Sequence, residues 1–298
     1  MKRLAEHFVD ELMAHAADDA RVWLLDGDLA DSYGATVFAD RFPDRFVMAG
    51  IAEQNMVSVA AGMASCGARP FVFSFAAFLA YRAADQIRVG LVQSRLPVTL
   101  VASHAGGCSG RNGRSHSATG DIALMASLAG IEVWAPADRH DVVAAVAAAR
   151  SGDVPLYCRT PRDALADLAM PPGAVRVASG GGGALILACG LATHWALEAQ
   201  ALLAGEGISC DVASVARLCP LPRDIDMLLA EPRPLIVIED HMRTGGLADL
   251  VAARTGCVPD LWFGWHDHPP GGDTGAVRQW GGLDAATIAG AVRDRLRR

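Results

Sequence analysis

Long apolar runs, paired cysteines and basic patches are missing from this sequence. No apolar run reaches the roughly 18 residues that a membrane-spanning helix needs, and the opening MKRLAEHFVDELMAHAADD is amphipathic and acidic, unlike a signal peptide or an anchor. The seven cysteines are scattered and lack a CxxC pair, which argues against a zinc ribbon and indicates a reduced, cytosolic protein. Acidic residues outnumber basic ones, 33 to 26, so we expect no binding to nucleic acid or to an anionic membrane.

Charged residues make up only 20% and aromatic residues 6% of the chain, whereas 52% of its residues are hydrophobic. A chain of 298 residues with this composition can bury a large core, in one large or two medium domains. Buried-looking strands alternate with helix-like segments, a pattern typical of parallel sheets with helices on both faces. The strands expected in the first half are 22–30, 45–50, 69–75, 96–106, 131–138 and 154–158.

Proline and then four consecutive glycines interrupt this alternation around MPPGAVRVASGGGG, residues 170–183. We interpret residues 171–183 as a linker. A second series of strands and helices follows it, including ALILACG, ISCDVASVARLCP and PLIVIED, and ends in a helix at 284–298. The predicted fold class is therefore α/β, with two parallel-sheet α/β domains: residues 1–170 and residues 184–298.

Glu53 stands out in the stretch AGIAEQNMVSVAAGMA because it is a carboxylate at the start of an otherwise apolar helix. Burial of an ionised carboxylate is costly. The helix follows a predicted strand, and the carboxyl ends of strands are where open α/β sheets bind ligands. From spacing alone, a simple role at the N-terminus of its own helix explains Glu53 equally well.

Two further motifs follow Glu53 in the sequence. FSFAAFLAYRAADQIR places Phe75, Phe78 and Tyr81 at spacings that predict one helical face, an arrangement that is more often core. SHAGGCSGRNGRSHSATGD is a loop rich in glycine and serine, framed by His104 and His116, and such loops after strands often bind ligands.

These motifs, in this order, resemble the pyrimidine-binding domain of the transketolase family of thiamine diphosphate enzymes. ALILACG, IVIEDH and GGL in the second half resemble the C-terminal domain of that family. The resemblance implies that Glu53 hydrogen-bonds N1′ of the aminopyrimidine, which Phe78 stacks on, with Phe75 and Tyr81 beside it.

The resemblance also implies roles for the polar residues around the cofactor. His104 and His116 would contact substrate oxygens and transfer protons, and Arg159, in LYCRTPR, would bind a substrate phosphate. Arg162 is a second candidate for this phosphate, although a surface charge explains it equally well. Arg82 and Gln86 are weaker candidates that surface exposure explains equally well. His241 is expected to be structural, and the segment WFGWHDHPPGG, residues 262–272, to be a surface loop and not a metal site.

The sequence departs from typical transketolases in the histidine-framed loop. It has GRNG where they have GEDG, so that Arg111 and Asn112 replace two acidic residues. Asn112, at a position that recognises a sugar hydroxyl, keeps the ability to hydrogen-bond but lacks the charge. These changes suggest a more anionic acceptor than an ordinary aldose phosphate.

A second departure is that the sequence begins at the pyrimidine-binding domain. Typical transketolases first have a domain that holds the diphosphate through Mg²⁺, and the DGD at 26–28 lies on the first strand of the pyrimidine domain instead. The resemblance thus implies the C-terminal subunit of a split transketolase. It would self-associate and pair with an N-terminal, diphosphate-binding subunit that holds most of the Mg²⁺, in an α2β2 assembly.

Three alternatives stay open. One is the β subunit of a 2-oxo-acid dehydrogenase, which shares the domain order and the glutamate. Another is an enzyme like deoxyxylulose-phosphate synthase, in which the two thiamine-binding domains are fused. The third, from a different class, is a degenerate subunit kept for assembly or regulation. The presence of Glu53, Phe78, His104, His116 and Arg159 argues against that last alternative.

Overall fold

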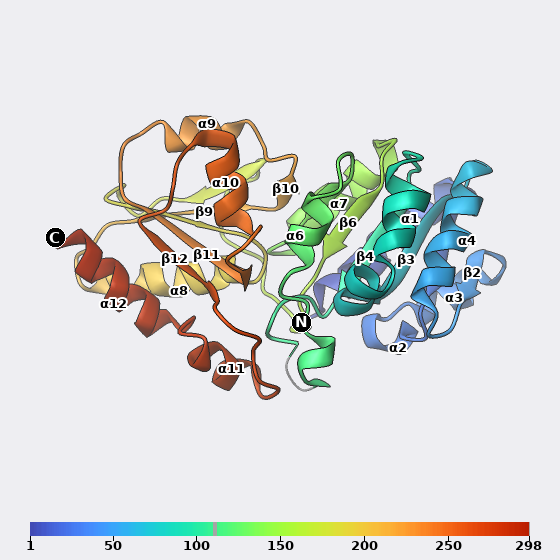
Figure 1. The fold of residues 1–298 in the computed structure, drawn as a ribbon, viewed down its shortest axis with the longest axis horizontal. Coiled ribbons are helices and arrows are strands. Elements are labelled where there is room, and N and C mark those ends of the chain that lie inside the picture. Colours follow the sequence, from blue (N-terminus) through green and yellow to red (C-terminus); the bar gives the residue numbers. More distant parts are fainter. Residues whose placement is uncertain (110–111, 298) are drawn as a thin grey trace.

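The computed structural model describes residues 1–109 and 112–297 as two α/β domains side by side, the first on the right of Figure 1 and the second on the left. In the first domain the strands are β1 (Val22–Asp26), β2 (Phe46–Met48), β3 (Arg69–Phe75), β4 (Thr99–Ser103), β5 (Glu132–Trp134) and β6 (Leu156–Arg159). Each of them lies within a segment where the sequence predicts a strand or ends one residue beyond it. The α/β prediction is confirmed.

The helices of the first domain connect these strands. They are α1 (Leu4–Asp18), α2 (Ala30–Tyr33), α3 (Thr36–Arg41), α4 (Glu53–Ser65), α5 (Ala84–Gln86), α6 (Asp121–Ala126) and α7 (Arg139–Ser151), with the short 3₁₀ helices η1 (Pro43–Arg45) and η5 (Arg114–His116) and the π-helices η2 (Phe78–Arg82) and η3 (Ile87–Val92). Asp138 begins α7 as an N-cap, because its side chain accepts a hydrogen bond from the backbone N–H of Asp141.

The second half of the chain contributes five strands to a second sheet and one strand to the first sheet. Its elements are β7 (Val175–Ala178), β8 (Leu185–Ala188), α8 (Ala192–Gly205), β9 (Asp211–Val215), β10 (Arg217–Cys219), α9 (Asp224–Leu229), β11 (Leu235–Met242), α10 (Leu247–Thr255), β12 (Leu261–Trp265), α11 (Thr274–Trp280) and α12 (Ala285–Leu296). The sheet orders are β10-β5-β6-β4-β3-β1-β2 and β12-β11-β8-β9-β7. Both sheets are parallel except for the pairs β10–β5 and β7–β9.

Three sequence expectations differ from this topology. The expected linker, residues 171–183, contains β7, which pairs along β9, so this segment is partly an edge strand of the second sheet. The segment 208–220, expected to belong to the second series of strands and helices, forms two strands, and the later one, β10, joins the first sheet. The segment expected as a surface loop at 262–272 begins with β12, because its large apolar side chains pack along β11, whereas His266, Asp267 and His268 are exposed.

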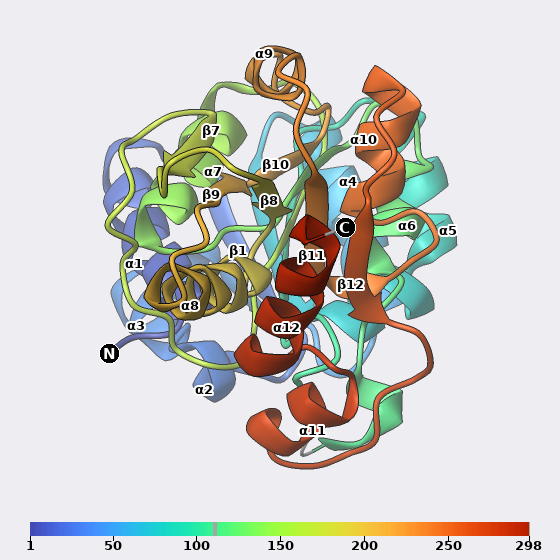
Figure 2. The ribbon, with the colours of Figure 1, turned by 90° about the vertical axis from the view of Figure 1, so that its left-hand side faces the viewer.

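Helices cover both faces of the sheets, and the two faces form separate apolar layers. In Figure 2, α1, α7 and α8 lie on one side of the strands and α4, α6 and α10 on the other. Each layer is continuous across the two domains: Phe8 and Phe73 belong to the same cluster as Trp195, and Met56 belongs to the same cluster as Val251. Burial of apolar surface therefore stabilises the domains together.

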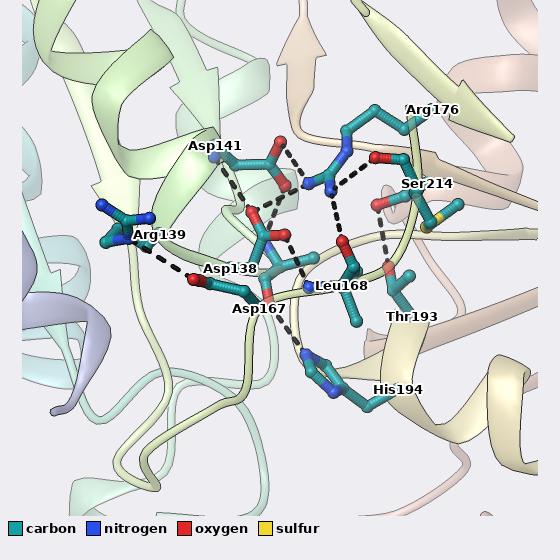
Figure 3. A network of polar contacts seen from close by, with 11 residues as sticks. Asp138, Arg139, Asp141, Asp167, Leu168, Arg176, Thr193, His194 and Ser214 are labelled. Carbon is teal, nitrogen blue, oxygen red and sulfur yellow. Dashed lines mark hydrogen bonds and ion pairs between the residues drawn. The ribbon is translucent and has the colours of Figure 1, made fainter. Parts of the chain in front are cut away.

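A buried polar network also joins the domains. Arg176, on β7, lies between two carboxylates at the start of α7, donating to Asp138 at 2.8 Å and to Asp141 at 3.2 Å (Figure 3). The ring of His194, on α8, bonds the carbonyl oxygen of Ala137 at 2.7 Å. Because ions removed from water must be paired, these contacts restrict how the second domain sits on the first.

Among the described residues, no helix is long and apolar enough to cross a membrane. All seven cysteines are described, and none is in a disulfide.

Candidate active site

The candidate site lies at the carboxyl edge of the first sheet, where Glu53 is the first residue of α4 and is fully buried. Its Oε1 accepts a hydrogen bond from Ser74 Oγ, on β3, at 3.0 Å, and its Oε2 is ion-paired with Arg82 Nη1. The order of the strands reverses between β1 and β3, so the site lies at the point where open α/β sheets bind ligands. Among the described residues, one side chain donates to each oxygen of Glu53, and each oxygen has the capacity to accept a further hydrogen bond.

Two of the predicted aromatic residues meet beside Glu53. Phe75 and Phe78 have ring centroids 5.8 Å apart, and the guanidinium of Arg82 lies 4.2 Å from the centre of the Phe78 ring. The spacing predicts one helical face for the three aromatic residues, and this prediction is wrong. Phe75 is the last residue of β3, whereas Phe78 is the first residue of the π-helix η2. Tyr81 reaches Gly120, four residues beyond His116, and its hydroxyl accepts a hydrogen bond from Gly120 N at 2.8 Å.

Both predicted histidines reach the same aromatic pair. The ring of His104 lies 4.1 Å from that of Phe75, and the ring of His116 lies 5.1 Å from that of Phe78. His104 is buried at 6% exposure and has a φ of +58°, a conformation that is rare for residues other than glycine and that often marks functional sites. The structure thus brings Phe75, Phe78 and the two histidines together as four neighbouring rings, and their roles in one site with Glu53 stay a prediction.

Burial and nearby cations keep His104 neutral. Desolvation is the main cause that lowers its pKa to about 4, and the charges of Arg162, Arg3 and His116 lower it further. A neutral imidazole can accept or donate a proton at its ring nitrogens. Its Nδ1 lies 3.1 Å from Ser103 Oγ.

Other predicted site residues are placed differently. Asn112 is exposed, and Arg111 lies outside the described residues. Arg159 is 5% exposed and is committed to internal partners: Asp121 Oδ2 at 3.0 Å and the carbonyl oxygens of Ala118 and Asp240. This geometry argues against the phosphate-binding role that the resemblance implied for Arg159, because its guanidinium already holds these acceptors.

Two acidic residues that lie near the site are assigned no role in it from the sequence. Asp26, at the end of β1, is buried; it accepts hydrogen bonds from the hydroxyl of Tyr33 and from the N–H groups of Leu29 and Ala30, and burial raises its pKa. The DGD motif at 26–28 marks Asp26 in the sequence. In the structure, however, the Asp26 carboxylate is used in local hydrogen bonds to the residues that follow β1. Asp121, which pairs with Arg159, lies in no recognisable motif, and only its place at the end of the loop could have drawn attention to it.

Comparison with known proteins identifies the architecture. The pyrimidine-binding domain of transketolases matches residues 3–167, and the transketolase C-terminal domain matches residues 173–267. The chain belongs to the transketolase family. It is 31% identical over 287 residues to a protein of Methanocaldococcus jannaschii named as a transketolase C-terminal section, covering 92% of this chain and 90% of that protein.

Other relatives indicate a split arrangement. A 6-deoxy-6-sulfo-D-fructose transketolase subunit from Clostridium sp. strain MSTE9 is 31% identical and covers 85% of this chain and 80% of that subunit. A split-gene transketolase solved as an inactive β4 tetramer is 32% identical, with a TM-score of 0.86, and the match covers 100% of this chain and 99% of that one. By contrast, the chain spans about half, 47%, of the 1-deoxy-D-xylulose-5-phosphate synthase of Syntrophotalea carbinolica, to which it is 32% identical.

A transketolase mutant from Pichia stipitis, solved in a complex with xylulose 5-phosphate, shares the fold with a TM-score of 0.86 at 20% identity. This chain covers 46% of it. The pyrimidine-binding domain implies dependence on thiamine diphosphate. Among residues 1–109 and 112–297, no three His, Cys, Asp or Glu side chains are grouped to hold a metal ion.

Proposed function

We propose that this chain is the C-terminal, pyrimidine-binding subunit of a split thiamine diphosphate-dependent transketolase. It would transfer a two-carbon ketol unit from a ketose donor to an aldehyde acceptor. The observation that carries the proposal is the buried Glu53 at the start of α4, next to the Phe75–Phe78 pair and both histidines, in a chain that matches split relatives along nearly its whole length.

The residues present fit an aminopyrimidine. Glu53 would accept a hydrogen bond from a ring N–H with its buried carboxylate. Phe78 would stack on the planar heterocycle with the ring face that Arg82 does not cover, and Phe75 and Tyr81 would flank the heterocycle. When bound, thiamine diphosphate supplies the carbanion chemistry. This chain would orient the ring and hold a proton at the Glu53 carboxyl.

His104 and His116 would hold and move protons on the substrate oxygens. The rings approach Phe75 and Phe78 from the loop side, so a substrate between them and the aminopyrimidine would be within reach of both. Arg162 and Arg3, whose charges act on His104, favour an anionic group on the substrate. Asn112 remains the proposed hydroxyl contact, and the GRNG loop, together with the relative that acts on a sulfo-sugar, supports a strongly anionic acceptor.

The diphosphate and Mg²⁺ would be held mainly by a second polypeptide. This chain spans about half of the fused enzymes it resembles, whereas it covers nearly all of the split relatives. The proposed assembly contains two copies of this chain and two of the diphosphate-binding subunit. A cytosolic location, expected from the cysteine pattern, stays a prediction.

The test is reconstitution with a candidate diphosphate-binding subunit, thiamine diphosphate and Mg²⁺, using hydroxypyruvate or xylulose 5-phosphate as the donor. We expect ketol transfer by the mixture and none by either subunit alone. Glu53→Gln should lower kcat by at least about 100-fold, since the carboxyl acts on the cofactor itself. Ser65→Ala, on an exposed residue at the far end of α4, is the matched control.

Two results would contradict the proposal. Full activity of the Glu53→Gln complex would remove the catalytic assignment. A wild-type complex that binds the cofactor and turns over pyruvate, but neither hydroxypyruvate nor a ketose, would favour the dehydrogenase or synthase alternatives.

A further inference from the structure

The loop that carries both site histidines is closed at its base. We call residues 104–109 and 112–120 the histidine loop; it leads from β4 to α6. Near its two ends, Gly106 and Ala118 exchange backbone hydrogen bonds, at 3.0 Å from Gly106 N and at 3.2 Å from Ala118 N. The positions of His104 and His116 therefore depend on what holds this base.

The N-terminal side of this base, at Gly106 and Gly107, is held by a carboxylate of the other domain. Asp240, on β11, is 3% exposed, and its Oδ1 accepts a hydrogen bond from Gly107 N at 2.8 Å. The same oxygen accepts a second hydrogen bond from Trp265 Nε1, on β12, at 2.7 Å. The indole therefore fixes the carboxylate that in turn fixes the loop.

The other end of the base is held by the backbone of the same strand. Arg159 Nη2 donates to the carbonyl oxygen of Asp240 at 3.1 Å and to that of Ala118 at 3.3 Å. One step further along, Met242 N donates to the carbonyl oxygen of Thr119 at 2.7 Å. Both ends of the histidine loop are thus tied to β11.

The two glycines of the motif HAGG permit this close approach. A Cβ on Gly106 would collide with the Asp240 carboxylate, and a Cβ on Gly107 would collide with the Trp265 ring. Gly106 also has a φ of +82°, a conformation that strains residues with side chains. The glycines therefore serve the contact between the domains, in a loop whose side chains serve the site.

We propose that Asp240 is a positioning residue for the reaction: the second domain holds the base of the histidine loop through this carboxylate and so sets where His104 and His116 stand. The proposal rests on the proposed function for its effect on catalysis. It gives the second domain a part in positioning the groups that act on the substrate.

Hydrogen–deuterium exchange of this chain, without partner or substrate, tests the structural half. Asp240→Ala removes the acceptor, and we expect exchange at Gly107 and at the Gly106–Ala118 pair to become about 10- to 100-fold faster, the range for a lost hydrogen bond to a charged group. Asp240→Asn keeps an oxygen in the Oδ1 position, and we expect it to restore exchange to within about threefold of the wild type.

Asp211→Ala is the matched control. Asp211 is another buried carboxylate of the second domain that accepts a backbone hydrogen bond, from Gly180 N at 2.8 Å, but it is remote from the histidine loop. We expect it to lower the melting temperature while leaving exchange in the loop unchanged. Should Asp240→Ala fail to fold, Asp240→Asn and Trp265→Phe carry the test, because Trp265→Phe removes the second donor and keeps the ring against Gly107.

The reconstituted complex tests the catalytic half. Asp240→Ala should lower kcat/KM for ketol transfer by about 10- to 100-fold while the Kd of thiamine diphosphate changes by less than about threefold, because Glu53 and Phe78 lie outside the loop. Asp240→Asn should recover most of kcat/KM. A wild-type complex without ketol transfer would refute the proposed function, yet the exchange experiment would still decide whether Asp240 holds the loop.

Several outcomes overturn the proposal. One is unchanged loop exchange in Asp240→Ala, or in Trp265→Phe if that variant has to replace it. Another is equal acceleration in Asp211→Ala at the same loss of melting temperature. A third is faster loop exchange with an unchanged kcat/KM, which would show that the contact holds the loop without serving the reaction.

Discussion

Glu239, next to Asp240 on β11, makes the stability of the second domain depend on pH. Its carboxylate is fully buried and accepts hydrogen bonds from Leu247 N at 2.6 Å and from Trp262 Nε1 at 2.7 Å, so it joins the start of α10 to β12. Burial is the main cause that raises its pKa to about 7, against an ordinary value of 4.5, and the hydrogen bonds oppose this shift.

The sign and size of the effect follow from this difference. Between pH 4.5 and pH 7 the folded state keeps a proton on Glu239 that the unfolded chain releases. The stabilisation is therefore complete below the unfolded pKa and is lost as the pH rises through the folded pKa. At about 1.4 kcal/mol per pKa unit, we expect Glu239 to cost about 2 kcal/mol of unfolding free energy between pH 5.0 and pH 7.5.

The assay compares the wild type with Glu239→Gln by thermal and urea unfolding at both pH values. The glutamine does not titrate, so the difference in unfolding free energy between the two proteins should change by about 2 kcal/mol between the two pH values, or about 4–8 °C in melting temperature. The variant is expected to be less stable overall, because its amide nitrogen faces an N–H donor. Equal differences at pH 5.0 and pH 7.5 would refute the reasoning, since other groups titrate alike in both proteins.

Three more predictions concern the site. Arg82→Gln should lower the unfolding free energy by about 1–3 kcal/mol, because it leaves Glu53 buried without its cation, and Glu53→Gln in the same chain should recover part of the loss in a double-mutant cycle. The His104 ring should show no NMR titration between pH 5.5 and 8, because its folded pKa is lowered to about 4. The stability that neutral His104 contributes is lost as the pH falls below the unfolded pKa near 6.5. A titration midpoint above 6 would contradict this environment. Gly107→Ala should destabilise by about 1–3 kcal/mol through collision with an indole, whereas Gly62→Ala, in open space on α4, should stabilise by about 0.5–1 kcal/mol; equal shifts in chemical denaturation would contradict the packing.

Most of the first domain could be predicted from the sequence because its strands are short apolar runs between helices. The continuous run in RPFVFSF, for example, corresponds to β3 in the middle of the first sheet. The edge strands were harder to predict. The segment containing β7 has too much glycine and proline around it to resemble a strand, and Arg176 on it is buried only because Asp138 and Asp141 from the other domain receive its charge.

The candidate site could be predicted only in part, for a related reason. Glu53, Phe78 and the two histidines were found from ordered motifs, and the structure brings them together. The role of Arg159 depended on what lies opposite it, and no pattern within LYCRTPR indicates that Asp121 and Asp240 supply its partners. An arginine at the end of a strand pairs with the acceptors that neighbouring elements bring close to it, and these elements are distant in the sequence.

The polar triplet at the end of β11 shows how the two domains depend on each other. Glu239 bonds α10 and β12, Asp240 bonds the base of the histidine loop, and His241 accepts a hydrogen bond from Ala123 N, on α6, at 3.4 Å. All three side chains are buried. The partners of Glu239 lie within the second domain, whereas Asp240 and His241 each accept a hydrogen bond from the first domain, so satisfying these two requires the domains to meet as they do. The carboxyl end of β11 therefore lies against the carboxyl ends of β4 and β6, from which the histidine loop and Arg159 extend. Because a parallel sheet presents its loops at that edge, the second domain contacts the loop that carries the site histidines through the same edge geometry that forms the site.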